Sequence, residues 1–316
     1  MSFNKFLDPK NDFAFKRIFG TERNKDILID FINVVVGFSG DERIADVSFL
    51  KTSQDPDIAY RKQSLVDVLC TDEKGRQYII EMQVAKTSGF EKRAQYYAAK
   101  AYSRQLNEGE QYTKLKAIIF VAITDFVMFP DKTSYLSQHI VLDKETYAHD
   151  LKDFSYTFLE LPKFKKEIDA LDDIIERWAY FFKHAEATHE QDIERIAGFD
   201  ESIVRAYEEL NRFCWSEEEL NTYEAEEKRE RDAQAVLQAK LEDAKAKGER
   251  IGEARGKAEG LVEGKAEGLA EGKAKGLAEG LKASQLAIAK KLLAANMPIC
   301  DVTKITGLSA DELEPK

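Results

Sequence analysis

The chain contains little of the side-chain chemistry from which zinc sites and disulfides are built. Among its 316 residues there are three cysteines and four histidines. The cysteines, Cys70, Cys214 and Cys300, are far apart in sequence, and no CxxC or HExxH spacing supplies a set of zinc ligands. We therefore expect reduced thiols in the core and exclude zinc-dependent hydrolysis.

Nucleotide-binding loops and long hydrophobic runs are missing as well. No GxxxxGKS/T or GxGxxG motif follows a strand-like run. No stretch reaches the roughly 18 apolar residues that cross a bilayer. The start, MSFNKFLDPKNDF, lacks a basic region followed by an apolar run. The sequence therefore predicts a cytoplasmic protein with no membrane partner.

The chain also lacks the excess of basic residues that is common in nucleic-acid-binding proteins. It has 47 Lys and Arg against 58 Asp and Glu, a net charge of −11. The acidity belongs to the back half, because residues 1–125 contain 19 Lys and Arg against 18 Asp and Glu. A near-neutral front region can still present a basic face to DNA. The charge counts neither support nor exclude a nucleic-acid partner.

The front half alternates helical and strand-like segments. Apolar spacing predicts a helix or helix pair over residues 11–36, with a break near Gly20 and Thr21. A second helix is expected at 89–107, and strand-like runs cover residues 44–50, 63–71, 76–84 and 116–124. This order predicts a mixed α/β sheet in a domain of residues 1–165. Residues 154–164 add an edge strand or a loop that packs on the sheet.

The back half is helical and repetitive. Residues 166–247 have an acidic helical pattern, and Ser216 with Glu219 predicts a capped helix start. Between Gly248 and Gly280 a glycine recurs at every fourth position, nine in all. Each glycine costs a helix about 1 kcal/mol relative to alanine. Residues 248–282 therefore form either a flexible or loosely helical linker or a helix that self-associates along the small-residue stripe. Self-association would make the protein a homo-oligomer.

The last segment, residues 283–316, predicts a small helical tail with helix-turn-helix spacing. The spacing fits a DNA-reading motif, but the helix that would take the recognition position is acidic. A small packing or dimer motif therefore fits the pattern as well.

One hairpin in the front half has acidic residues inside apolar strands: VDVLCTDEKGRQYIIEMQV, residues 66–84. A turn centred on Glu73 and Lys74 makes Asp67 and Glu81 cross-strand neighbours to within one residue, with Cβ atoms about 5 Å apart. Alternation makes both faces of the first strand apolar, so we expect it to be covered. Asp67 would share a face with Leu65 and Leu69, opposite to Val66, Val68 and Cys70.

Two carboxylates opposed on a covered strand pair repel each other and lose hydration, which costs several kcal/mol unless something compensates. A divalent cation is one compensation. Mg²⁺ takes one or two carboxylates and leaves positions for water and phosphate oxygens, an arrangement that suits phosphodiester hydrolysis. The alternative is that the strand edges are open to water, so that the acids are solvated or one of them pairs with a lysine or arginine.

The same residues resemble a known nuclease motif. Glu81-Met82-Gln83, with Glu81 fourteen positions after Asp67, is similar to the PD-(D/E)XK motif. The flanking segments narrow the resemblance: DPKNDFAFKRIFG, IIEMQ, KRAQYYAAKAYSRQLNEGEQYTKLKAIIFVAI, LELPKF, and the glycine repeats followed by TGLS. Together, and over nearly the whole chain, they are similar to the Rpn family of recombination-promoting nucleases, also described as PD-(D/E)XK nuclease family transposases.

This resemblance implies a restriction-endonuclease-like core and a DNA endonuclease that depends on Mg²⁺ or another divalent cation. Asp67, Glu81 and the backbone carbonyl of Met82 would hold the metal. Gln83 stands where the wider superfamily has lysine, and an amide can only orient a water through hydrogen bonds. The alternative to a metal-dependent endonuclease is therefore a nuclease-derived protein with weak or no activity, which works through DNA binding or its C-terminal repeats.

Further residues are carried over onto the helices. Asp12 is the candidate for an additional acidic residue near the metal, or a helix N-terminal acid favoured by the dipole. Lys16, four residues on, would contact phosphate or pair with Asp12. Arg93, Tyr97 and Gln105 would face the site or the DNA backbone. A solvated helix face with Tyr97 in the core is equally compatible with the pattern.

Overall fold

The computed structural model describes residues 4–54 and 64–313. Gln63 of the expected second strand and residues 314–316 of the expected tail lie outside this range. The chain divides into two compact units, Met1–Asp232 and Ala233–Lys316. A six-stranded mixed sheet with helices forms the first unit, and the second is helical. The predicted fold class, a PD-(D/E)XK-type α/β core followed by a helical C-terminal region, is confirmed.

The sheet mixes antiparallel and parallel strands in the order β1-β4-β5-β6-β8-β7. Strand β4 is antiparallel to both β1 and β5. Strands β5, β6 and β8 run parallel, and β7 forms the edge antiparallel to β8. Every residue of β6 is buried, as its sequence IIFVAIT requires of a strand covered on both faces. The strands are β1 (Val47–Phe49), β4 (Val68–Asp72), β5 (Gln77–Gln83), β6 (Ile118–Thr124), β7 (Leu136–Ile140) and β8 (Phe154–Glu160), with β2 (Ser53–Gln54) and β3 (Ser64–Leu65) forming a separate pair.

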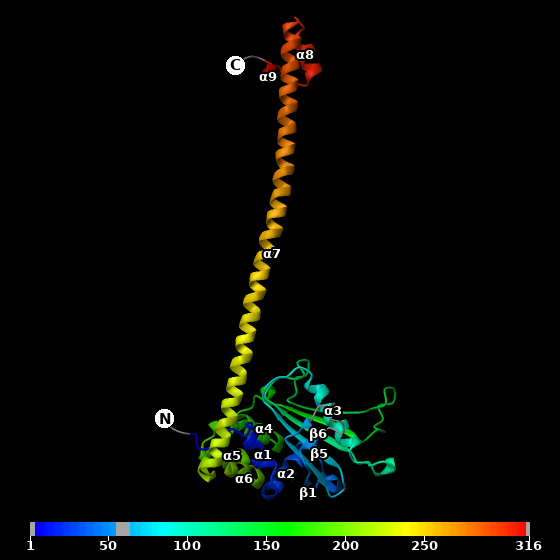
Figure 1. The fold of residues 1–316 in the computed structure, drawn as a ribbon, viewed down its shortest axis with the longest axis vertical. Helices are drawn as coiled ribbons and strands as arrows, with labels where there is room; N and C mark the ends of the chain where they lie inside the picture. Colours follow the sequence, from blue (N-terminus) through cyan, green and yellow to red (C-terminus); the bar gives the residue numbers. More distant parts are fainter. Residues whose placement is uncertain (1–3, 55–63, 314–316) are drawn as a thin grey trace. The chain divides into compact units, whose positions relative to one another are not determined.

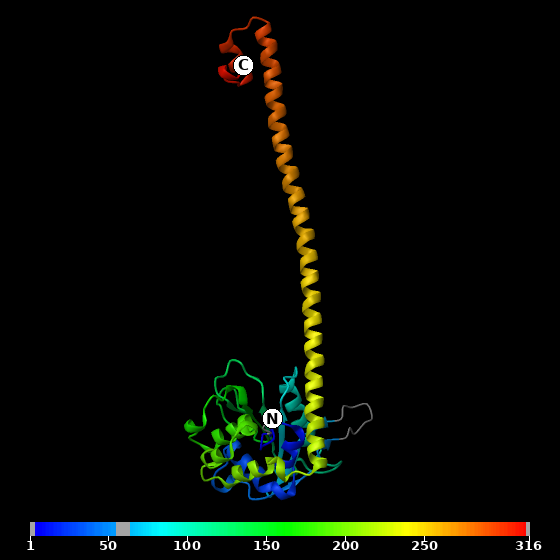
Figure 2. The same cartoon turned by 90° about the vertical axis from the view of Figure 1, so that its left-hand side faces the viewer.

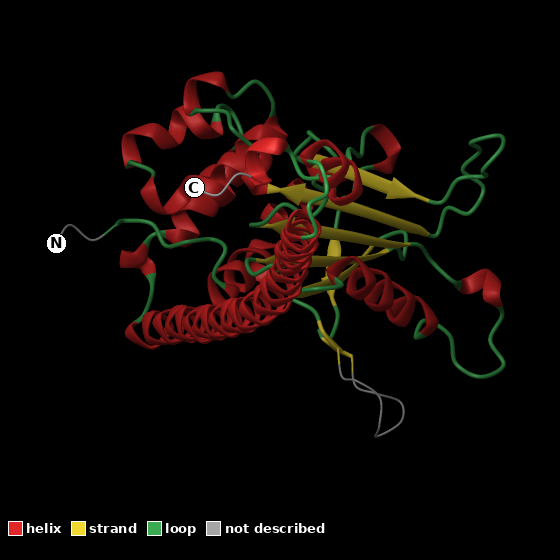
Figure 3. Ribbon diagram, turned by 90° about the horizontal axis from the view of Figure 1, so that it is seen from above, coloured by secondary structure: helices red, strands yellow, loops and turns green. Residues whose placement is uncertain are grey.

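Helices cover the two faces of the sheet unequally (Figure 1 and Figure 3). One face packs on a cluster rich in aromatic rings, in which Phe19 and Phe31 contact Trp178 and Phe182. On the opposite face, the one helix that packs among the described residues is α3 (Phe90–Ser103), beside residues of the loop after β6. The helices of the larger cluster are α1 (Asp12–Phe19), α2 (Lys25–Val36), α4 (Ile174–His184), α5 (Ile193–Ala197) and α6 (Glu201–Leu210). The expected helix pair with a break at Gly20 is confirmed, because the Gly20 N–H ends α1 on the Lys16 carbonyl.

Several sequence expectations were wrong in detail. Residues 154–164 were expected to form an edge strand or a loop, but they begin with β8, which lies inside the sheet. The edge is formed by β7, which was not predicted. Asp67 lies at a bend between β3 and β4, so Val66 packs in the same cluster as Leu69 rather than with Val68. Of the three thiols only Cys70 is in the core, whereas Cys214 and Cys300 are exposed.

Helix α7 (Glu217–Ala294) begins in the first unit and continues through the second. Its start is capped as predicted, because Ser216 Oγ accepts from the Glu219 N–H while the Glu219 carboxylate accepts from the Ser216 N–H. Within the first unit Tyr223 is buried, and its hydroxyl accepts from the Asp8 N–H at 3.0 Å.

In the second unit α7 stays helical through all nine repeat glycines, and a Cβ added at any of them would meet nothing within 4 Å. Helices α8 (Ile299–Thr306) and α9 (Ala310–Leu313) lie beside the last turns of α7, around Ala289, Val302 and Leu308 (Figure 2). Residues 248–282 are helical in the structure, which fits both a helical linker and a self-associating helix. Self-association and the domain boundaries expected after residues 165, 247 and 282 stay predictions.

Within the described residues, no helix is both long enough and apolar enough to cross a membrane.

Candidate functional site

The β4–β5 hairpin brings the two expected carboxylates together. Val68 pairs with Ile80 and Leu69 with Ile79, a register that sets Asp67 opposite Glu81. The turn that fixes this register is tied by Asp72, whose Oδ1 accepts from the Lys74 and Arg76 N–H groups. Ile80 and Met82 belong to the aromatic cluster and Ile79 to the α3 side, so alternation directs Glu81 to the face that α3 covers.

Each carboxylate has one oxygen in a distinctive environment. Asp67 Oδ2 accepts from the Met82 N–H at 2.8 Å, which fixes its side chain against β5. Glu81 is 4% exposed, and within the described chain its buried Oε1 has no hydrogen-bond partner. A buried, unpaired carboxylate oxygen is costly unless a cation or a proton satisfies it.

The electrostatics of the pair follow from this burial. Burial raises the pKa of Asp67 to about 6, with the Met82 hydrogen bond opposing the shift and the Asp12 charge adding to it. Burial, followed by the charge of Asp67, raises the pKa of Glu81 well above its usual value. Raised carboxyl pKa values caused by burial and a neighbouring acid are common at functional sites.

Helix α1 adds an acid and a base beside the hairpin. Asn11 caps the helix, its Oδ1 accepting from the Phe13 and Ala14 N–H groups. Lys16 Nζ lies 2.7 Å from Asp12 Oδ1 and 4.0 Å from Asp67 Oδ1. Asp12 is thus a half-exposed acid of the first helical turn that pairs with Lys16, as the alternative interpretation had it, and it also lies close enough to raise the pKa of Asp67.

Helix α3 contributes Arg93 and Tyr97 to the same cluster. The Arg93 guanidinium lies 4.7 Å from the Phe90 ring centroid and 5.9 Å from that of Tyr97, and its buried Nε has no hydrogen-bond partner among the described residues. Its charge lowers the pKa of both Asp67 and Glu81, which places it close to them. A cavity of about 570 Å³ opens at this end of α3, lined by Thr87, Ser88, Gly89, Phe90, Lys92, Arg93, Tyr96 and Tyr97.

Gln83 ends β5 on the same face as Glu81, opposite Thr124 of β6. Its backbone carbonyl accepts from the Asp125 N–H. Lys86, three residues after Gln83, donates to the Val127 carbonyl at 3.4 Å. Among the described residues, Lys16 and Arg93 are the cations that lie beside the carboxylates.

Gln105 does not join the group. Its side-chain amide donates to the Lys116 carbonyl at 3.0 Å and accepts from the Lys116 N–H at 2.8 Å. Lys116 precedes the start of β6, whereas Glu81 pairs with Ala122 near the other end of that strand. The helical extrapolation failed because α3 ends at Ser103, before Gln105.

A buried ion pair that the sequence did not predict lies next to the site. Glu160, at the end of β8, pairs with Thr124 in register, and its Oε1 lies 2.7 Å from Lys163 Nζ. Glu160 Oε2 accepts from the Met128 and Phe129 N–H groups, and Lys163 also donates to the Phe129 carbonyl. The signal was present in LELPKF, where an acid and a base lie three residues apart. Because the segment was interpreted as an edge or loop, burial was not expected.

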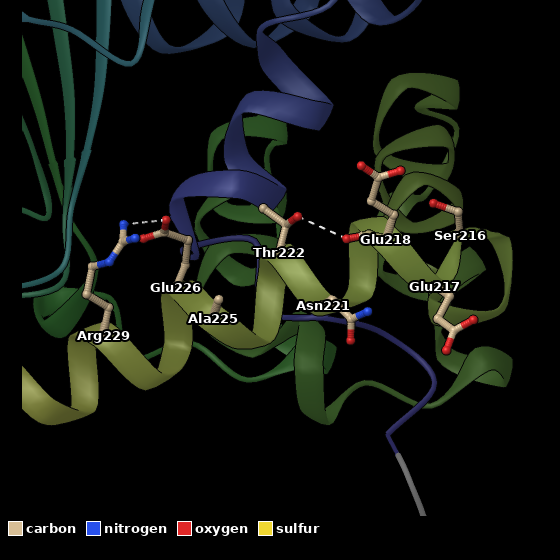
Figure 4. A pocket seen from close by; sticks show the side chains of 8 residues that line it. All are labelled: Ser216, Glu217, Glu218, Asn221, Thr222, Ala225, Glu226 and Arg229. Atoms are coloured by element: carbon tan, nitrogen blue, oxygen red, sulfur yellow. Dashed lines mark hydrogen bonds and ion pairs between the residues drawn. The ribbon is translucent and has the colours of Figure 1, made fainter.

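A second, open hollow lies along the start of α7 (Figure 4). Its polar groups bond along their own helix, Arg229 to Glu226 and the Thr222 hydroxyl to the Glu218 carbonyl. Its lining comes entirely from Ser216–Arg229, without a residue of the hairpin, α1 or α3. It therefore adds nothing to the carboxylate cluster.

The raised pKa of Asp67 predicts how stability depends on pH without metal. An acid whose native pKa is above its unfolded value stabilises the native state below the unfolded pKa, and loses this contribution as pH rises through the native pKa. In EDTA, the unfolding free energy of the wild type relative to Asp67→Asn should fall by about 2–3 kcal/mol between pH 4 and pH 7. Urea unfolding of both proteins across this range measures the difference, and a flat difference would contradict the raised pKa.

The donor set is small but suits a hard cation. Among the described residues no group of three or more His, Cys, Asp and Glu side chains is arranged to hold a metal. Asp67 and Glu81 supply two carboxylates, one with an unpaired buried oxygen. Mg²⁺ typically takes one or two carboxylates and fills its other positions with water and phosphate oxygens.

Comparison with known proteins gives one family. The family model described as PD-(D/E)XK nuclease family transposase matches residues 9–240. No curated protein and no solved structure matches the chain.

Proposed function

The chain belongs to the PD-(D/E)XK nuclease family of transposases, and from this membership we propose that it is a divalent-metal-dependent DNA endonuclease that hydrolyses phosphodiester bonds. The proposal includes Mg²⁺ as the cation, DNA as the substrate, a cytoplasmic location and a role in recombination or transposition. The family supports nuclease or transposition chemistry as the general class of function.

One observation supports the metal most strongly, the buried and unpaired Glu81 Oε1 opposite Asp67. The local charges point the same way. When ionised, the carboxylates of Asp12, Asp67 and Glu81 exceed the two cations, Lys16 and Arg93, by one negative charge. A divalent cation reverses this to one positive charge, the sign needed to hold a phosphate.

Asp67, Glu81 and the Met82 carbonyl are the proposed ligands. A cation bound there would neutralise developing charge on the scissile phosphate and lower the pKa of a water. Lys16 on α1 and Arg93 on α3 reach the site from different elements and would hold phosphate oxygens, Arg93 with its planar fork. The Gln83 amide, on the Glu81 face of β5, would orient the attacking water by hydrogen bonding.

A second candidate function rests on Gln83. Gln83 stands where the superfamily motif has lysine. Its amide has no charge and takes no proton at neutral pH, so it cannot replace the lysine as a cation or a base. A weak or inactive nuclease-derived protein would keep DNA binding and act through its C-terminal repeats. Both candidate functions include self-association through residues 248–316. Deleting these residues should lower the oligomeric state, which light scattering measures as the number of chains in the particle.

Nicking of supercoiled plasmid by the purified full-length protein tests the proposal. We expect nicking with Mg²⁺ that EDTA abolishes and that an Asp67→Ala protein, purified in parallel, does not show. The parallel preparation controls for contaminating nucleases. Equal nicking by both preparations, or none by either while both are folded and shift DNA in a gel, would favour the binding protein.

A further inference from the structure

The face of the sheet that carries Glu81 is only partly covered by helix. Helix α3 packs on it through Phe90, Ala94 and Ala98, over Ile79 of β5 and Phe120 of β6. A helix is about 10 Å wide and neighbouring strands are about 4.8 Å apart. One helix therefore covers two or three strands of the six. The same face of β8 and β7 is left to side chains and a loop.

An aromatic pocket of about 390 Å³ lies on this uncovered part. Its rings come from Phe129 in the loop after β6, His139 on β7, and Tyr156 and Phe158 on β8. The Phe129 ring lies 4.9 Å from the His139 ring at an interplanar angle of 33°, and 5.3 Å from the Phe158 ring at 81°. The volume falls in the range of about 300–1,000 Å³ that holds small planar ligands.

Hydrogen bonds with buried side chains hold the backbone of the loop that carries Phe129. The buried Glu160 accepts from the Phe129 N–H, and Lys163 donates to the Phe129 carbonyl. The ion pair of Glu160 and Lys163 therefore holds one wall of the pocket at both polar groups of the Phe129 backbone.

Strand register places the pocket on the same row as the carboxylates. Glu81 pairs with Ala122, and Ala122 pairs with Phe158. Phe158 therefore lies two strands from Glu81, about 10 Å across the sheet. Three stacked nucleotides at about 3.4 Å each span this straight distance. Because α3 lies between the two places, a strand that reaches both must pass over the helix and needs more than three nucleotides.

Helix α3 separates the two places and contributes to both. Glu91 and Gln95 line the aromatic pocket, whereas Arg93 and Tyr97 face the carboxylates. The two places therefore lie on opposite sides of the same helix.

Charges at the pocket favour a base over a phosphate. The Glu91 carboxylate repels phosphate but accepts a hydrogen bond from the exocyclic amino group of a base. Burial, together with Lys132, lowers the pKa of His139, so its imidazole is a neutral flat ring at neutral pH. A cation lies beside two residues of the lining, because Lys132 Nζ is 3.3 Å from His139 Nε2 and 5.0 Å from the Phe129 ring centroid. It can hold the backbone phosphate of a nucleotide whose base enters.

We propose that this pocket receives an unpaired nucleobase of the DNA strand bound at the carboxylate site, stacked on Phe129 and Tyr156 with its amino edge at Glu91. The inference rests on the proposed function, because it takes the substrate of that site to be DNA. Stacking on aromatic side chains tolerates all bases. The pocket therefore binds unpaired strands without requiring a sequence.

The test compares two short single strands of equal length, bound in EDTA so that no strand is cut. One strand carries bases, with 2-aminopurine at every third position, and the other is abasic throughout and keeps only the charged backbone. The full-length wild type should bind the base-bearing strand about 5- to 150-fold more tightly and quench its 2-aminopurine fluorescence. The proteins compared are the wild type, Phe129→Leu, Tyr156→Leu, Tyr156→Phe and, as an exposed aromatic outside the pocket, Phe199→Leu.

Loss of the base preference in Phe129→Leu and Tyr156→Leu, with unchanged affinity for the abasic strand, would support the pocket. Tyr156→Phe and Phe199→Leu should retain both the preference and the quenching, because each keeps the pocket rings. The same preference in all five proteins, or none in the wild type, would overturn the proposal. Plasmid nicking by the wild type with Mg²⁺ is scored separately, so failure of the nuclease and failure of the base pocket are distinguishable.

Discussion

Replacing Glu81 by glutamine will abolish metal-dependent cleavage and leave the fold intact. Glutamine keeps the shape of the side chain in its buried position but removes the charge that a cation needs. Metal stabilisation of a phosphoryl transition state is worth several kcal/mol. At about 1.4 kcal/mol for each factor of ten, we expect plasmid nicking to fall by roughly 1,000-fold or more.

Stability should move in the opposite direction to activity. The buried Glu81 carboxylate faces Asp67, and the resulting rise in its pKa means that its ionised form is disfavoured in the native protein. Glu81→Gln removes this penalty, so the unfolding free energy in EDTA at pH 7 should not decrease. Urea unfolding measures it alongside the nicking assay.

The control is Glu108→Gln, which removes a carboxylate from an exposed position and should leave nicking unchanged. Metal-dependent cutting by Glu81→Gln at the wild-type rate would remove Glu81 from the site. A variant that neither cuts nor folds would be uninformative about the metal, which is why the two measurements are made on the same preparation.

The second large effect is on stability and involves Lys163. This side chain is 8% exposed and neutralises Glu160, which is fully buried. Breaking a buried pair by removing one partner leaves an uncompensated charge, at a cost of about 3–5 kcal/mol. Lys163→Met should therefore lower the unfolding free energy at pH 7 by about that amount, as measured by urea unfolding.

A double variant separates loss of the charge pair from loss of packing. Adding Glu160→Gln to Lys163→Met removes the stranded charge while its amide oxygen can still accept from the Met128 or Phe129 N–H. Most of the lost stability should then return, because paired groups are not additive. A double variant as unstable as Lys163→Met would show that the methylene packing of Lys163, and not its charge, stabilises the loop.

How far the sequence predicts this structure depends on the range of the interactions involved. The hairpin register was predictable to within one residue, because alternation and a polar turn are local signals. The position of Asp67 at a bend was not, since the interruption between β3 and β4 has no sequence signal as clear as a proline or glycine. The class of the α/β core followed from element order.

Features that depend on distant partners were missed. Strand β7, with the sequence LSQHI, alternates weakly and forms only because β8 offers an edge. The burial of Glu160 depends on the loop carrying Phe129, more than 30 residues earlier in the chain. Gln105 was misplaced for the opposite reason, because a local helical pattern was extended past the residue where α3 ends.

The candidate site divides between these two cases. The spacing on one short hairpin made Asp67 and Glu81 candidates, whereas the role of Gln83 came from the resemblance to the PD-(D/E)XK motif. The proximity of Lys16 and Arg93 to that hairpin is a tertiary result, because α1 and α3 lie on opposite sides of it in the sequence.

The separation of signs has a consequence for dynamics. Both opposed acids lie on one hairpin, whereas their cations arrive on α1 and α3. If α1 opens locally, Asp67 loses both the repulsion of Asp12 and the attraction of Lys16, and Glu81 loses the attraction of Lys16. Protonation of the acids and docking of the helix are therefore thermodynamically linked. Hydrogen exchange at the amides of α1 should therefore depend on the protonation of Asp67 and Glu81. Exchange measured in one helix thus reports the charge on a hairpin elsewhere in the chain.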